Sequence, residues 1–538
     1  MARNDQNDDQ PDPTSDIGPE HQKKLDWSKV AQPLFDVMEQ SQDDEPIDVI
    51  IDLNLIYGDG RETAAKRVAQ LVHKIVGSAS PSYKDGGLGI EGPEGPDLTP
   101  QYQYARLLPA QIRELSKRDS AADKSVRGAI YKIWYDHPVE PLLTKSVSTV
   151  KADAAKVAFG AVGAGVVWAV VDSGIQHDHP HFEKYQNLDL ADTPGVPGDP
   201  VLDHRDFTGE GREREDGYGH GTHVAGIIAG ESSFTDACDR GRREHPDDAL
   251  QDVERRARSQ MRAYTRYLDE NEDVQPIAVD ISHIAGVAPK CKLVSLKVLD
   301  SHGRGKVSNI IKALGYVQTV NEYGRWLHIH GVNLSVGYEF NAEWFACGQS
   351  PLCVEVDRLV RSGVAVVVAA GNTGYGFAQT EAKGAVRAGI DVTINDPGNA
   401  ERAMTVGSTH REKPHVYGVS YFSSKGPTGD GRAKPDLVAP GEKIISCAAG
   451  SLKSDMEKKV AATGEPEHDF RYVESSGTSM AAPHVSGAIA AFYSIRREFV
   501  GKPERTKQIL MDTATDLGRE RYFQGRGLVD LMRAIQSV

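Results

Sequence analysis

From about residue 141 to the C-terminus, short apolar runs alternate with segments whose apolar residues recur at helical spacing. Such short runs are typical of strands buried on both faces. They predict strands at residues 166–171, 292–299, 331–335 and 364–370. Helices are predicted after His220, from Lys306, at 354–362 and after Ser479. This alternation predicts an α/β fold, a doubly wound and mostly parallel sheet covered by helices on both faces. Reactive side chains should gather at the carboxyl ends of the strands.

The first 140 residues follow another pattern. Residues 1–40 are polar, acidic and punctuated by prolines, which predicts a mobile acidic N-terminal tail. Residues 41–140 contain strand candidates at 47–53, 102–107 and 126–135, with helical spacing near 65–75 and from Pro109. Two β-α passages of this size predict a small α+β domain with a split βαβ arrangement. Residues 141–538 form the larger domain.

Residues 231–282 interrupt the alternation of apolar strands and helices in the larger domain, because they are rich in Asp, Glu and Arg. Their apolar residues keep helical spacing, at Leu250, Val253, Ala257, Met261, Tyr264 and Leu268. We therefore predict an inserted, charged amphipathic helix at about 231–282. It is either a docking arm for a protein partner or a surface elaboration without a partner.

Composition narrows the possible partners. The 538 residues are 39% hydrophobic and 26% charged, with a net charge of −15. This acidic balance argues against nucleic acid and anionic membranes as partners. The longest apolar run, residues 157–171, is shorter than the ~20 residues that span a bilayer. Five cysteines do not look like a disulfide framework, and the N-terminus lacks the apolar core of a signal peptide, so we expect a cytoplasmic location.

Three short motifs carry an acid, a base and a nucleophile in a fixed order. Asp172 lies in Val-Asp-Ser-Gly, His220 in His-Gly-Thr-His-Val-Ala-Gly, and Ser479 in Gly-Thr-Ser-Met-Ala-Ala-Pro-His. A serine hydroxyl needs a base to take its proton, and an aspartate can hold the imidazole in the correct tautomer. Asp, His, Ser is the chain order of one class of serine-hydrolase triad.

Each of the three has a plainer interpretation. Ser479 could be a simple N-cap serine, although Ser475 and Ser476 fit that role better. His220 and His223 could bind a metal, but no His-Glu-x-x-His pattern is present. Asp216 is another acid near His220 and is treated as secondary.

The three motifs resemble those of the subtilisin-like (subtilase) serine proteases. The resemblance extends over about residues 141–538 through further segments at 286–289, 422–427, 434–441 and 527–530. It implies a subtilisin-like fold in which Ser479, His220 and Asp172 are catalytic. It also implies that Asn372, at the end of an apolar strand, donates an amide hydrogen to the oxyanion, where the alternative is a turn asparagine.

The resemblance further implies that a polypeptide substrate binds as an extended strand between two edge segments, 301–305 and 335–337. The substrate-binding residues are then Gly303, Gly305, Ser335, Val336 and Gly337. We expect the glycines among them to let a second backbone approach closely.

One departure from the family bears on cofactors. Calcium-binding subtilases have an aspartate ligand after a His-Pro pair, whereas His181 follows His179-Pro180 here. The insert also replaces the loop that supplies other ligands. We therefore predict no cofactor and no metal site; calcium stays possible, but its usual strong site looks disrupted. The spaced histidines His177, His179 and His181 could bind a transition metal, yet a solvated turn is the favoured interpretation.

These patterns predict a serine endopeptidase that works through an acyl-enzyme. The N-terminal α+β domain resembles the inhibitory prosegment of subtilases, so the chain is predicted to be an autoinhibited zymogen whose own N-terminal domain is its inhibitor. Two alternatives stay open: a regulated scaffold whose cleft is plugged by that domain, and an esterase or transacylase with the same triad.

Overall fold

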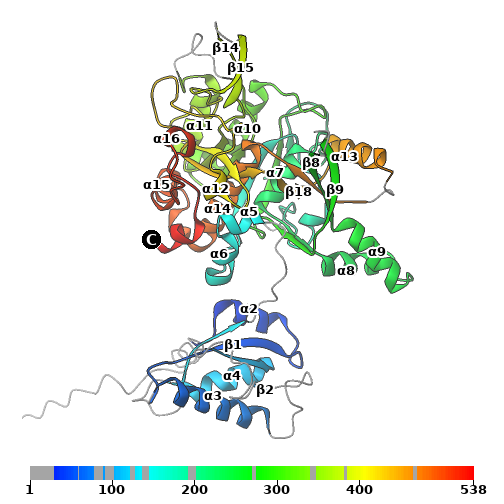
Figure 1. Ribbon diagram of the computed structural model, residues 1–538, viewed down its shortest axis with the longest axis vertical. Coiled ribbons are helices and arrows are strands. Elements are labelled where there is room, and N and C mark those ends of the chain that lie inside the picture. The colour runs from blue at the N-terminus through cyan, green and yellow to red at the C-terminus, as the bar shows by residue number, and fades with distance from the viewer. Residues whose placement is uncertain are drawn as a thin grey trace, which may run out of the picture. The chain divides into compact units, whose positions relative to one another are not determined.

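The computed structural model describes residues 29–58, 60–77, 89–90, 102–120, 128–135, 145–191, 202–268, 274–339, 347–380, 384–464 and 469–538. The chain divides into two compact units, Met1–Val139 and Glu140–Val538. In Figure 1 the elements of the first are blue to light blue, and those of the second run from cyan to red. None of the helices in the described ranges has the length and apolar character needed to cross a membrane.

The N-terminal unit is built on a four-stranded antiparallel sheet in the order β2-β3-β1-β4. Its elements are β1 (Ile47–Leu53), α3 (Arg61–Val76), β2 (Gly89–Ile90), β3 (Tyr102–Leu107), α4 (Pro109–Ser120) and β4 (Ile130–Tyr135). Every second residue of β3 is buried, which is the period of a strand with one covered face. The succession β-α-β-β-α-β agrees with the split arrangement that the sequence predicts.

The structure corrects the boundary of the predicted tail. Helix α2 (Gln32–Gln40) lies within residues 1–40, and its Leu34 and Met38 are buried in the core of the N-terminal unit. These two residues are one helical turn apart, so they form an apolar stripe that the polar composition around them obscured. Residues 1–28 lie outside the described residues.

The second unit contains a seven-stranded, all-parallel sheet in the order β17-β16-β13-β12-β5-β11-β6. Its strands are β5 (Val167–Asp172), β6 (Arg205–Asp206), β11 (Lys292–Lys297), β12 (Gly331–Leu334), β13 (Ala365–Ala369), β16 (Met404–His410) and β17 (Leu437–Glu442). Trp168 and Val170 of β5 pack in one hydrophobic cluster, and Val171 packs in a second cluster. Both faces of the sheet are therefore covered, as the sequence predicts for a doubly wound fold.

Helices α7 (His220–Ile228) and α14 (Thr478–Ile495) pack in the first cluster, and α10 (Val307–Val320) and α11 (Pro351–Arg361) in the second. Helix α14 is apolar around its whole circumference and almost entirely buried, as expected of a central helix. The smaller helical elements are α5 (Lys145–Thr149), α6 (Ala152–Phe159), η2 (Pro180–Phe182), η3 (Glu322–Gly324), α12 (Pro414–Tyr417), α13 (Gly450–Ala462), η4 (Arg497–Phe499), α15 (Pro503–Thr513), α16 (Arg521–Gln524) and α17 (Leu531–Gln536). Strands β14 (Tyr375–Thr380) and β15 (Gly384–Gly389) form a separate hairpin.

The prediction of one inserted helix at 231–282 is wrong. The segment contains β7 (Glu231–Ser233), α8 (Phe234–Glu244), α9 (Leu250–Gln260), β8 (Arg262–Leu268) and β9 (Val274–Asp280), and β10 (His283–Ala285) follows directly after it. Strand β8 pairs with β19 (Tyr472–Ser475), giving a sheet in the order β18-β19-β8-β9 with β18 (Ile444–Cys447). Figure 1 shows α8 and α9 together and β8 beside β9. Only the first half of the helical pattern forms a helix, because pairing with β19 draws the second half into a sheet.

Candidate active site

Three of the predicted site residues meet at one edge of the parallel sheet. Strand β5 ends at Asp172, Ser335 follows the end of β12, and Asn372 follows β13. These strands are neighbours in the order β13-β12-β5, and Leu334 is in register with Val171 and Val368. The carboxyl ends therefore bring side chains from distant parts of the sequence together.

Asp172 and His220 are joined directly. The Nδ1 of His220 lies 2.7 Å from Oδ1 of Asp172. Asp172 is fully buried, whereas the side chain of His220 is 23% exposed. Because a carboxylate accepts, Nδ1 carries the proton in the neutral ring, and Nε2 is left as the basic nitrogen.

The surroundings of His220 raise its basicity. Burial alone would lower the pKa of His220, but the charge and the hydrogen bond of Asp172, together with the charge of Asp216, outweigh it and raise the pKa above its ordinary value. One unit of pKa corresponds to about 1.4 kcal/mol of preference for one protonation state. The site thus stabilises the imidazolium that a general base becomes.

Asp216, treated as secondary from the sequence, caps the helix that carries the base. Its Oδ1 accepts from the N–H of Gly219 at 2.7 Å, and its Oδ2 accepts from the N–H and hydroxyl of Thr222 at 2.8 and 2.7 Å. These donors belong to the first turn of α7, where backbone N–H groups lack partners within the helix. Asp216 therefore orients His220 through the first turn of α7.

His223, the second histidine of the same motif, lies away from this chemistry. It is completely buried, and its Nε2 is 3.1 Å from the carbonyl oxygen of Val473. Burial lowers the pKa of His223 to about 3, so the ring is neutral at physiological pH. Its position ties α7 to β19 rather than to the carboxylate of Asp172.

Ser479 and Ser335 exchange hydrogen bonds. The hydroxyl of Ser479 donates to the carbonyl oxygen of Ser335 at 3.1 Å, and the hydroxyl of Ser335 donates to the carbonyl oxygen of Ser479 at 2.8 Å. The second bond is possible because Pro483, four residues on, has no N–H to donate to that carbonyl. Among the described residues, no hydrogen bond joins the hydroxyl of Ser479 to His220.

The structure corrects one local detail of the nucleophile helix. The sequence predicts a helix after Ser479, but α14 already begins at Thr478, and Pro483 lies inside it. Ser479 is therefore the second helical residue, and its backbone N–H has no acceptor within the helix. The free N–H and the positive end of the helix dipole both face the start of α14, where an anion is favoured.

Asn372 presents its amide nitrogen to the site. Its Oδ1 accepts from the N–H of Thr478 at 2.9 Å and from the hydroxyl of Thr478 at 3.0 Å. Asn372 is exposed, so its Nδ2 hydrogens are the part of the amide left for a ligand. Thr478 is a contributor that sequence reasoning missed, although its place before Ser479 in the Gly-Thr-Ser motif was a usable signal.

The two predicted substrate edges lie at this carboxyl end, but their glycines serve the protein itself. A side chain at Gly303 would run into the ring of Tyr218, since its Cβ would lie 2.6 Å from that ring. A Cβ at Gly337 would lie 2.5 Å from the carbonyl oxygen of Asp396. Val336 is partly buried, and Gly337 and Gly305 are exposed. A Cβ at Gly305 would likewise lie 2.5 Å from the carbonyl oxygen of Val298, so packing against the protein itself requires all three glycines, and pairing of these edges with a substrate backbone stays a prediction.

The residues at the expected calcium position do not fit that ion. His181 is buried against Tyr472, with its Nδ1 3.4 Å from the tyrosine hydroxyl, and burial lowers the pKa of His181 to about 4. His179 is also buried and bonds the carbonyl oxygen of Arg471. The interpretation of these two histidines as a solvated turn is therefore wrong, although His177 is exposed. Within the ranges that the structure describes, no group of three or more His, Cys, Asp or Glu side chains is arranged to hold a metal ion.

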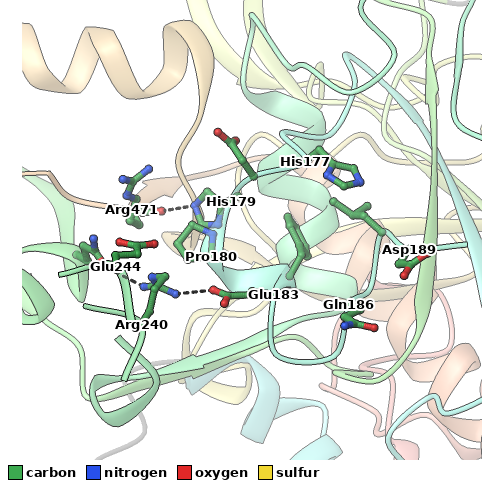
Figure 2. Close-up of a pocket in the computed structure, with 13 residues that line it drawn as sticks. His177, His179, Pro180, Glu183, Gln186, Asp189, Arg240, Glu244 and Arg471 are labelled. Carbon is green, nitrogen blue, oxygen red and sulfur yellow. Dashed lines mark hydrogen bonds and ion pairs between the residues drawn. The ribbon is translucent and has the colours of Figure 1, made fainter. Parts of the chain in front are cut away.

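A pocket of about 490 Å³ lies next to these histidines, away from the triad. Figure 2 shows it between the segment of His177 and Asp189 and the insert residues Arg240 and Glu244. Arg240 bonds Glu183 at 3.2 Å across it. None of the predicted catalytic residues lines this pocket.

Comparison with known proteins gives a consistent result. A family model described as the Subtilase family matches residues 163–528. Pyrolysin from Pyrococcus furiosus is 30% identical over 354 residues, which is 59% of this chain and 21% of pyrolysin. Serine protease AprX from Bacillus subtilis is 26% identical over 417 residues, covering 76% of this chain and 74% of AprX. Subtilisin E from the same organism is 26% identical over 443 residues, covering 82% of this chain and 84% of subtilisin E.

Proposed function

Because this chain belongs to the subtilase family of serine endopeptidases, we propose that it cleaves polypeptides with Ser479 as nucleophile, His220 as base and Asp172 as orienting acid. The observation that carries the proposal is the 2.7 Å bond between His220 and Asp172 at the sheet edge where Ser335 and Asn372 also lie. Before attack, the hydroxyl of Ser479 must leave the carbonyl of Ser335 and turn toward Nε2 of His220.

The proposed reaction then follows the acyl-enzyme route. His220 takes the proton of Ser479 as the oxygen attacks the peptide carbonyl, and later gives a proton to the leaving amine. The developing oxyanion is stabilised by Nδ2 of Asn372 and by the free N–H of Ser479. Water hydrolyses the ester that forms, with His220 again acting as the base.

A fluorophosphonate probe tests this assignment, since it reacts only with an activated serine. We expect covalent labelling at Ser479, located by peptide mass spectrometry, and no labelling in Ser479→Ala. Ser476→Ala is the matched control, because this exposed serine lies just outside α14. Labelling retained in Ser479→Ala would contradict the proposal. Product analysis with peptide, ester and competing amine substrates separates an endopeptidase from an esterase or transacylase.

We also propose that the N-terminal unit inhibits the second unit until it is removed. The support is its resemblance to a prosegment and its compact β-α-β-β-α-β fold with a core of its own. The test compares labelling of Ser479 in the full chain with labelling after residues 1–140 are removed. A rise on removal is expected for a zymogen. No labelling in either form favours the scaffold alternative.

The cytoplasmic location stays a prediction. All five cysteines are free and buried, which is typical of proteins in reducing compartments. Partner binding by the 231–282 insert also stays a prediction.

A further inference from the structure

A buried lysine stands beside the triad acid. Lys297, at the end of β11, is in register with Asp172 on β5, and its side chain is 1% exposed. Its Nζ donates to the carbonyl oxygen of Ser173 at 3.0 Å and pairs with Oε2 of Glu210 at 3.3 Å. A buried ammonium persists only where such partners compensate its lost hydration. The carbonyl oxygen of Ser173 and the carboxylate of Glu210 therefore compensate the buried charge of Lys297.

The first partner, Ser173, contacts both the acid and the base segment. Its N–H donates to Oδ1 of Asp172 at 2.8 Å, and its hydroxyl accepts from the N–H of Gly221 at 2.9 Å. Gly221 directly follows His220 in α7. A displacement of Ser173 would thus move the carboxylate and the imidazole relative to each other.

The second partner, Glu210, reaches the predicted substrate edge. Its Oε1 accepts from the N–H and the hydroxyl of Ser301 at 3.2 and 3.1 Å. The hydrogen bond from the N–H of Ser301, together with the hydrogen bond and charge of Lys297, outweighs burial, which alone would raise the pKa of Glu210, and leaves that pKa below its ordinary value, so Glu210 is ionised at neutral pH. Ser301 begins the turn that leads to Gly303 and Gly305. It also packs on the loop before His220, since a Cβ at Gly217 would lie 2.8 Å from that of Ser301.

We propose that Lys297 and Glu210 are a positioning pair that fixes the substrate-binding edge at 301–305 relative to the triad, without touching the substrate. The carboxylate of Glu210 links the two parts of the site. Its Oε1 accepts from Ser301 of the substrate-binding edge, and its Oε2 pairs with Lys297, which donates to the carbonyl oxygen of Ser173. This inference rests on the proposed function, because it assumes that 301–305 pairs with the substrate. It predicts that the pair acts on extended substrates and not on the chemistry itself.

Glu210→Gln tests this inference in the full-chain enzyme. The amide keeps the shape of the carboxylate but loses its charge, and its NH2 group would face either Lys297 or the donors of Ser301. Two substrates are compared: a peptide long enough to pair with 301–305, and a small activated ester of a single residue. We expect KM for the peptide to rise about tenfold with kcat within about twofold, since a charge-assisted hydrogen bond is worth about that factor. Kinetics on the ester should be unchanged.

The control is Glu355→Gln, which removes an ion pair with Arg358 on α11 at similar exposure, 23% against 28% for Glu210. It should match the parent on both substrates. An equal loss on peptide and ester in Glu210→Gln would mean a merely structural role and would overturn the inference, as would an unchanged peptide KM. Fluorophosphonate labelling of the parent reports on the triad separately: a labelled parent with an unmoved peptide KM overturns only the positioning pair. A parent that stays unlabelled both as the full chain and after removal of residues 1–140 overturns the proposed function and this inference with it.

Discussion

At the scale of single residues, the site depends on a helix carbonyl group that lacks its usual backbone donor and on a side-chain hydroxyl that takes the place of that donor. Pro483 leaves the carbonyl of Ser479 open, and the hydroxyl of Ser335 fills it. Asn333 donates to the same hydroxyl at 2.9 Å and accepts from Ser486 at 2.8 Å, so a buried polar chain holds β12 against α14. The backbone of Ser479 is thereby held in place, while rotation about χ1 alone moves its hydroxyl oxygen.

The raised pKa of His220 predicts the pH dependence. A general base must be neutral, and a pKa above the ordinary value of ~6.5 moves the acid limb of kcat/KM upward by the same amount. We expect activity to fall as pH drops through a midpoint above ~6.5. In Asp172→Asn the charge that raises this pKa is gone, so the midpoint should fall and the rate should drop by about 10⁴. A profile of kcat/KM from pH 5 to 9 checks this, and a flat profile would exclude His220 as the base.

Replacement of Asn372 by alanine tests the oxyanion donor. We expect kcat to fall with little change in KM, because the amide acts on charge that develops in the transition state. The size is borrowed from a subtilisin, the reference case in which loss of one such donor slows turnover by about 10²–10³. Because Oδ1 of Asn372 also accepts from the buried Thr478, the melting temperature should fall somewhat, so kcat is compared well below the melting temperature of the variant. A loss confined to KM would show that Asn372 binds the ground state instead.

At the scale of elements, the insert is attached by charge and by strand pairing. Glu231 at the start of β7 is buried and accepts from Lys156 at 3.1 Å and Lys184 at 2.8 Å. Strand β8 then pairs with β19, which lies shortly before Ser479 in the sequence. Strand β8 of the insert therefore belongs to the same sheet as β19, the strand that precedes Ser479.

Glu231→Gln should destabilise the second unit by about 1–3 kcal/mol, because it removes charge-assisted hydrogen bonds while the half-exposed lysines regain water. Burial would raise the pKa of Glu231, but His283, Lys156 and Lys184 outweigh it and lower that pKa strongly. The stabilisation is therefore complete above the unfolded pKa of ~4.3 and declines progressively as pH falls from there toward the lower folded pKa. Urea unfolding at pH 7 and at pH 3 checks this. The exposed Glu215→Gln should change neither value, and a difference between parent and Glu231→Gln that is as large at pH 3 as at pH 7 would contradict the linkage.

The elements show what the sequence could and could not reveal. The parallel strands were readable because burial on both faces leaves uninterrupted apolar runs, as in β5. Asp172 and His220, which the structure joins, and Ser479 could be proposed from the sequence because each lies in a distinctive motif. The strands β8 and β9 could not be predicted, because the helical spacing of Leu250, Val253 and Ala257 continues through Met261 and Tyr264. Tyr264 lies in a strand only because β8 pairs with β19, about 200 residues later in the sequence. Lys297 and Glu210 were equally hidden, because their pairing exists only after β11 and the loop after β6 come together.

At the scale of the whole molecule, the chain is two compact units whose boundary falls between Val139 and Glu140. The second unit carries all the proposed catalytic residues, and the first has its own core. If the chain is processed as a zymogen, we expect the cut around residues 137–143, which include this boundary and lie outside the described residues.

Self-processing predicts a simple difference between two proteins. The parent chain should acquire a new N-terminus within residues 137–143, whereas Ser479→Ala should keep its original N-terminus, because the proposed nucleophile would make the cut. N-terminal sequencing and intact mass measure both. An uncut parent with a reactive Ser479 would contradict self-processing, and equal cutting of both proteins would assign the cut to another protease.

The strand order of the large sheet has a kinetic consequence. Central strand β5 pairs with β11 and β12, so Trp168 must find Leu293 and Gly331 across long stretches of intervening chain. Closing such loops consumes entropy before any ladder forms, which makes folding slow and leaves a high barrier in both directions. The native protein is then protected because it unfolds rarely, so its lifetime among other proteases is governed by its unfolding rate. On brief heating, the fraction of activity lost should depend on the heating time as well as on the temperature.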